Sequence, residues 1–114
     1  MTGKNRSIIE LAEKLGHALA ETEEFKLKQE AEEALRQDEQ ARKLVKQFKN
    51  LKNSFDRMEK LGTPLSEKNR KQLKDAEERA MQHPLIKDWY DKTQKFYDLV
   101  IAVNKKMQEG MVGK

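Results

Sequence analysis

Hydrophobic residues recur every three or four positions along most of the chain, the spacing that places them on one face of an α-helix. The first stripe lies between Asn5 and Glu21 and consists of Ile8, Leu11, Ala12, Leu15, Ala18 and Leu19. Thr22 is a helix-capping residue followed by two glutamates, so we expect a break there and a second helix after it. No segment shows the strict alternation that is typical of a β-strand.

A third helix is expected between Asp38, its N-cap, and Leu61, because this segment contains no glycine or proline. Its apolar residues follow steps of four and three, as in helices that pack nearly side by side. These residues are Leu44, Phe48, Leu51, Phe55 and Met58. Gly62 fits the end of this helix, and Ser66 is a good N-cap for a fourth helix through about Gln82.

The last helix is expected to start at Pro84, where a missing N–H costs nothing, and to reach about Glu109. Its main apolar row contains Leu85, Trp89, Thr93, Phe96, Val100, Val103 and Met107. A second row lies roughly 100° away and contains Ile86, Tyr90, Tyr97 and Ile101. The sequence predicts an all-α fold, an elongated antiparallel bundle of about four to five helices including two long ones. It forms one domain over residues 1–114, ordered over about 5–109 and frayed over 110–114.

The apolar content of the chain is low for a free-standing domain, since Leu, Ile, Val and Phe make up about 21% of its residues. Because the last helix carries two apolar rows, one can pack inside the chain while the other packs on a partner. Aromatic side chains with polar tips favour protein interfaces. We therefore expect a homo-oligomer, with a dimer favoured. The interface residues expected are Ile86, Tyr90, Tyr97 and Ile101, with Trp89 and Phe96 beneath them.

The residues that carry catalysis or metal binding are scarce. Cysteine is absent, and His17 and His83 are the only histidines. Neither histidine belongs to a metal-binding pattern, and the serines have no nearby histidine or oxyanion glycines. We therefore expect no catalytic residue, no metal, no cofactor and no enzymatic activity. No segment has the run of about 20 apolar residues of a membrane span, and no signal peptide is evident, so a cytoplasmic protein is expected.

Residues 42–52 are the most polarised segment, with five basic residues and no acidic one. Arg42, Lys46 and Lys49 lie on one stripe, with Lys52 close by, and such a row can contact the phosphates of a nucleic acid. The alternative interpretation is a solvated face that pairs with the acidic segment 21–33. No aromatic residue lies among these cations, so base stacking is not indicated. With 39% charged residues but a net charge of only +4, overall charge does not decide between the two.

Several segments in this order resemble the YlbF/YmcA family of small bacterial helical proteins, including its YheA-like branch. The resemblance covers roughly residues 5–109 and depends mainly on helix boundaries and core positions. The matching segments are the stripe from Ile8 to Leu19, Glu23-Glu24-Phe25, the helix with Ala31 and Ala34, Asp38-Glu39-Gln40-Ala41 leading to Phe48, and His83-Pro84-Leu85-Ile86.

The resemblance implies long antiparallel helices, self-association and a location in the bacterial cytoplasm. Family members look like non-enzymatic accessory proteins, and some act in complexes that influence RNA processing, competence, sporulation and biofilm formation. Relatives linked to iron–sulfur clusters depend on cysteine, so this property is not expected here. The leading hypothesis is an oligomeric adaptor or regulatory subunit with a protein partner. The alternative is a nucleic-acid-binding accessory protein that uses Arg42, Lys46, Lys49 and Lys52.

Overall fold

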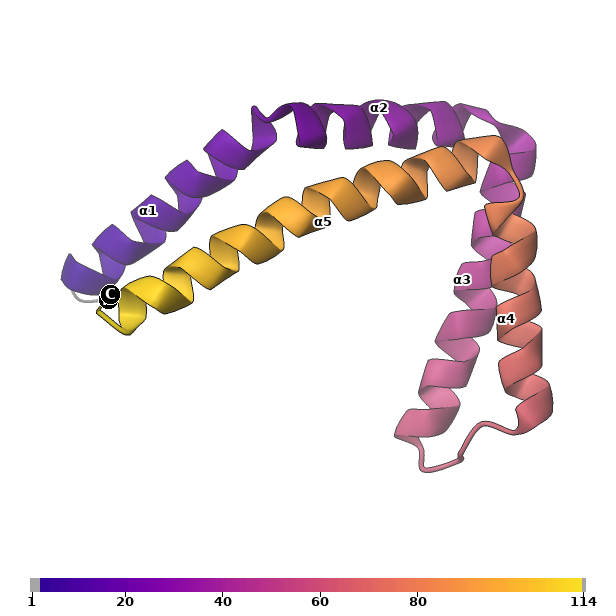
Figure 1. Ribbon diagram of the computed structural model, residues 1–114. Coiled ribbons are helices and arrows are strands. Elements are labelled where there is room, and N and C mark those ends of the chain that lie inside the picture. The colour runs from indigo at the N-terminus through magenta and orange to yellow at the C-terminus, as the bar shows by residue number, and fades with distance from the viewer. Residues whose placement is uncertain (1–2, 114) are drawn as a thin grey trace. The chain divides into compact units, whose positions relative to one another are not determined.

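The computed structural model describes residues 3–113, and within this range the chain is all-α, as predicted (Figure 1). Five helices follow one another, with no strand in the described range. They are α1 (Gly3–Ala20), α2 (Glu23–Gln37), α3 (Glu39–Lys60), α4 (Glu67–Met81) and α5 (Pro84–Met111). The expected two long helices are α3, with 22 residues, and α5, with 28 residues.

Short polar side chains set the helix boundaries where the sequence predicts them. Thr22 Oγ1 donates to the carbonyl of Leu19 over 2.7 Å and accepts from the N–H of Phe25 over 3.2 Å. It therefore closes α1 and caps α2. Ser66 caps α4 by accepting from the N–H of Asn69. Because these bonds satisfy backbone groups that a helix end leaves unpaired, the boundaries are determined locally.

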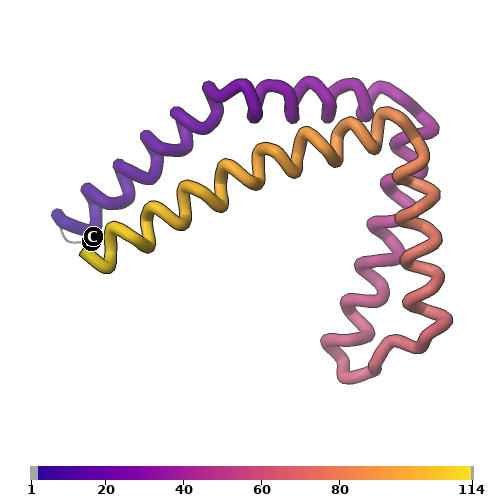
Figure 2. The backbone as a smooth tube through the Cα atoms, in the orientation of Figure 1, coloured from indigo at the N-terminus to yellow at the C-terminus, as the bar shows by residue number. Residues whose placement is uncertain are grey.

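The turn between α3 and α4 is built around Gly62. Its φ of +88° lies in the left-handed region, which glycine adopts without a steric penalty. The N–H of Gly62 donates to the carbonyl of Glu59, and the N–H of Thr63 donates to that of Met58. These bonds satisfy carbonyls at the end of α3. The two helices then fold back on each other as a packed hairpin (Figure 2).

The chain divides into two compact units. The described part of unit 1 consists of residues 3–30 and 92–113, and unit 2 consists of residues 31–91. Both α2 and α5 contribute residues to each unit. The last helix continues to Met111, past the residue where fraying was expected to begin, while Lys114 lies outside the described residues.

Unit 2 contains a hydrophobic core at the contact of three helices. Ala41 of α3, Ala80 of α4 and Ile86 of α5 are buried in one cluster. Alanine at two of these positions lets the backbones approach closely, so that one isoleucine fills the centre. The surrounding apolar side chains are Leu35, Leu44, Val45 and Met81. The prediction that Ile86 faces a partner is therefore corrected, because its side chain is only 3% exposed inside its own chain.

Unit 1 has no fully buried side chain among its described residues. Its clearest contact joins the rings of Phe25 in α2 and Phe96 in α5, whose centroids lie 5.3 Å apart in an edge-to-face arrangement. Large apolar side chains stay exposed in unit 1, namely Ile8, Ile9, Leu11, Leu15, Tyr97, Ile101, Met107, Met111 and Val112. Over its described residues, unit 1 thus consists of amphipathic helices whose apolar side chains are at most half-buried.

Candidate functional site

No group of His, Cys, Asp or Glu side chains within residues 3–113 is placed to hold a metal ion. His17 lies on the exposed surface of α1, where its Nε2 is 3.8 Å from a carboxylate oxygen of Glu13. No described helix is both long enough and apolar enough to cross a membrane. The surfaces that remain as candidates for function are therefore grooves and exposed faces.

Three of the four predicted basic residues line one groove in unit 2. Arg42, Lys46 and Lys49 follow the i, i+4, i+7 spacing of α3, and Arg36 joins them from α2. We call this the basic groove, which has a volume of about 450 Å³. Its remaining lining residues are Glu32, Leu35, Val45, Asn50, Asn53 and Trp89.

The predicted cations of the basic groove are not neutralised by the acidic residues around them. Arg42, Lys46 and Lys49 are exposed, and within residues 3–113 no carboxylate lies at ion-pair distance from any of them. Arg36 differs, since its guanidinium lies 3.3 Å from Glu33. The three cations of α3 are therefore available to a negatively charged ligand.

Trp89 brings an aromatic ring to the basic groove, a neighbour that the sequence did not predict. Its indole Nε1 donates to Oε1 of Glu32 over 3.4 Å, although the two residues are 57 positions apart in the chain. Position 89 was correctly placed on the main apolar row of the last helix. No local sequence pattern showed that this row lies next to the basic stripe of α3, because their proximity depends on how α2, α3 and α5 pack together.

A second groove, of about 410 Å³, lies next to the basic groove in unit 2. We call it the apolar groove, because Phe48, Met81 and Tyr90 line it. Lys52 lies here together with Glu77, so it was correctly predicted near the other cations but lines a different groove. The other lining residues are Val45, Lys49, Asn53, Ala80, Ile86 and Trp89.

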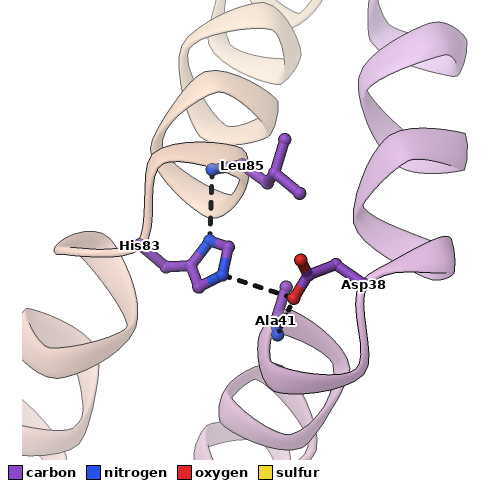
Figure 3. Close-up of polar contacts among 4 residues, drawn as sticks. All are labelled: Asp38, Ala41, His83 and Leu85. Carbon is purple, nitrogen blue, oxygen red and sulfur yellow. Dashed lines mark hydrogen bonds and ion pairs between the residues drawn. The ribbon is translucent and has the colours of Figure 1, made fainter.

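A polar contact between Asp38 and His83 connects the start of α3 to the start of α5 (Figure 3). Oδ1 of Asp38 accepts from the N–H of Ala41 over 2.8 Å, which caps α3. The same oxygen lies 3.4 Å from Nε2 of His83, whose Nδ1 accepts from the N–H of Leu85 over 3.2 Å. The ring thus contacts the start of α5 through Nδ1 and the N-cap carboxylate of α3 through Nε2. One carboxylate therefore helps to position α3 and α5, two of the three helices that line the basic groove.

Asp38→Ala is expected to lower the free energy of unfolding by about 1–2 kcal/mol, because it removes the N-cap of α3 and the contact with His83. Asp38→Asn should cost less than half as much, since an amide oxygen also caps a helix. Urea denaturation of the three proteins measures both values. Equal losses for the two variants would contradict the assignment of Asp38 as an N-cap.

The six predicted interface residues are divided between the two units. Ile86, Trp89 and Tyr90 belong to unit 2, where Ile86 is buried and the other two line the grooves. In unit 1, Phe96 packs on Phe25. The remaining members of the predicted set keep most of their surface free, with Tyr97 at 57% and Ile101 at 59% exposed.

The sequence matches the model of a known protein family over residues 8–111. This family, YlbF/YmcA, is described as control of the competence regulator ComK. Since the match covers nearly the whole chain, it includes the elements of both units.

Two similar proteins carry the name UPF0342. One, from Shouchella clausii (strain KSM-K16), is 30% identical over 98 residues, which cover 86% of this chain and 83% of that protein. The other, from Alkalihalophilus pseudofirmus (strain ATCC BAA-2126 / JCM 17055 / OF4), is 26% identical over 103 residues, which cover 90% and 87%. A solved structure, a protein of unknown function (DUF964) from Bacillus stearothermophilus, has the same fold, with a TM-score of 0.84, 18% identity and 92% coverage of both chains.

Proposed function

Because the chain belongs to the YlbF/YmcA family, as its helix-boundary motifs predict, we propose that it is a non-enzymatic adaptor that acts as a homo-oligomer in the cytoplasm. The description of the family, control of a competence regulator, supports a regulatory accessory role. Such a role requires surfaces that bind other protein chains rather than a catalytic site.

The observation that carries the proposal is the absence of a buried core among the described residues of unit 1. Tyr97 and Ile101 are one helical turn apart on α5 and are both mostly exposed. Ile8 and Leu11 leave a second apolar stripe exposed on α1. Covering these apolar faces with another chain removes them from water and so lowers the free energy of the protein.

A second copy of this chain is the partner that fits unit 1 best. Two copies related by a two-fold axis present the same stripes to each other, so each exposed face finds an apolar face of the same length. Packing the helices of unit 1 against those of a second copy gives a bundle with a shared core. A homodimer therefore supplies the buried area that the described part of unit 1 lacks.

The mass in solution, measured by light scattering behind size-exclusion chromatography, tests the proposal. We expect a multiple of 13.4 kDa at micromolar concentration, insensitive to salt because the interface is apolar. Tyr97→Glu combined with Ile101→Glu should shift the mass to that of one chain, because the dimer would bury two uncompensated charges on each protomer.

Tyr90→Glu is the matched control for this experiment. Tyr90 is 45% exposed on the same helix but lines the apolar groove of unit 2, so its replacement should leave the mass unchanged. A monomeric wild-type protein would contradict the proposal. So would a double variant that keeps the wild-type mass.

The alternative prediction, nucleic-acid binding through Arg42, Lys46, Lys49 and Lys52, gains some support because three of these residues share one groove. It gains less than the adaptor proposal does, because Lys52 does not line the basic groove and instead lines the apolar groove, as does Glu77. The ring of Trp89 in the basic groove is bonded to Glu32 and does not stand free to stack on a base. The adaptor function therefore has the stronger support.

A further inference from the structure

The basic groove and the apolar groove of unit 2 form one continuous surface. Val45, Lys49, Asn53 and Trp89 line both of them. One half of this combined groove is rich in cations, and the other half is rich in apolar and aromatic side chains. An occupant must therefore present negative charge along one side and apolar groups along the side next to it.

The spacing of the cations matches a helical occupant. Arg42, Lys46 and Lys49 follow one face of α3 for about 10 Å. On a second helix that lies along α3, carboxylates spaced by four and three residues repeat with the same rise. Such a helix places each of its carboxylates close to one cation. An extended chain has a different rise per residue, so its carboxylates do not match the spacing of the cations.

The apolar half has the composition of a surface that receives an amphipathic helix. Phe48 and Met81 are half-buried there, and Tyr90 is exposed. Methionine and aromatic side chains adapt to leucine-sized groups on the apolar face of a bound helix. An acidic helix with an adjacent apolar stripe would therefore fill both halves at once.

A nucleic acid fits the same surface less well. Its charges occur at every nucleotide, whereas most cations of the combined groove lie in its basic half and apolar side chains line much of the other half. The indole of Trp89 is held by Glu32 rather than standing free as a stacking platform. Charge complementarity therefore favours a ligand that carries its negative charge on one face.

We propose that the combined groove of unit 2 binds an acidic amphipathic helix of a protein partner. This inference deepens the proposed adaptor function, since it names the kind of partner that the adaptor recognises. It uses a surface different from the apolar stripes of unit 1 through which the chain is proposed to self-associate.

Trp89 is the only tryptophan of the chain and reports directly on the combined groove. The probe is a synthetic helical peptide of about 18 residues, with leucines on one face and glutamates beside them. We expect saturable binding that shifts the emission of Trp89 and weakens as salt increases. A peptide with lysines in place of the glutamates should not bind.

Two variants test whether the cations of the groove are responsible. Lys46→Glu combined with Lys49→Glu should weaken peptide binding at least about tenfold. Lys71→Glu combined with Lys74→Glu is the matched control, because these exposed residues of α4 have the same spacing, change the net charge equally and line neither groove. The control should bind the peptide like the wild-type protein.

The inference would be overturned if the acidic peptide did not bind, or if the Lys46→Glu, Lys49→Glu variant bound it with wild-type affinity. Tighter binding of a uridine oligonucleotide of about ten residues would overturn it as well. A change in mass of that variant would instead identify the groove as a contact between copies, which also overturns it. The Tyr97→Glu, Ile101→Glu variant should bind the peptide normally, so a failure of self-association leaves this test intact.

Discussion

Replacing Ile86 with alanine is expected to lower the free energy of unfolding by about 2–4 kcal/mol. Ile86 is the only large side chain among the three buried residues at the centre of unit 2, where it packs with Ala41 and Ala80. Neighbours that are already alanines cannot expand to fill the space that three lost carbons would leave. Since small domains are stable by only about 5–15 kcal/mol, urea denaturation should show a much lower midpoint.

Ile9→Ala is the matched control for this prediction, because it removes the same three carbons from a helix. Ile9 is 57% exposed and lies outside the apolar stripe of α1, and alanine has the higher helix propensity, so the change should stay within about 0.5 kcal/mol. If Ile86→Ala cost no more than this control, the core of unit 2 would not be centred on Ile86.

The helix boundaries were predictable because each depends on residues close together in the chain. Thr22 and Ser66 bond to backbone groups three residues away, and Gly62 supplies the left-handed residue that ends α3. The residues of each such boundary lie within about one helical turn, so the boundary does not depend on what the helix packs against. Helix number, order and approximate length therefore follow from the sequence.

The division of α5 between two units could not be predicted from its periodicity. Ile86 and Tyr97 lie on the same row of this helix, yet Ile86 is buried and Tyr97 is exposed. The first turns of α5 pack against α3 and α4 within unit 2, whereas residues from 92 onward belong to unit 1. A periodic stripe identifies an apolar face, but its neighbours at each turn are a property of the whole fold.

The basic groove was predicted only in part, for a similar reason. The spacing within α3 is local, so it correctly placed Arg42, Lys46 and Lys49 together. The contribution of Trp89 depends on its bond to Glu32 across 57 positions of sequence. No composition or spacing rule reports such a pair, so the sequence could describe the aromatic content of the α3 face alone and not the ring that α5 brings to the groove.

Hydrogen exchange is expected to divide the chain at the boundaries between the two units. In the Tyr97→Glu, Ile101→Glu variant, backbone amides of residues 3–30 and 92–113 should exchange roughly 100-fold faster than the slowest amides of residues 31–91. All buried side chains of the described range lie in unit 2. Opening unit 1 of a single chain therefore exposes little apolar surface that was not already in water.

The wild-type protein should behave differently, because association stabilises the unit that forms the interface. At a protomer concentration of about 100 times the dissociation constant, mass action slows the opening of unit 1 by roughly 100-fold, while unit 2 keeps its own rates. Exchange followed by mass spectrometry at two concentrations separates these effects. Rates in unit 1 that do not change on dilution would mean that it is held by contacts within one chain. The stability of unit 1 would then not depend on self-association through the exposed side chains of Tyr97 and Ile101.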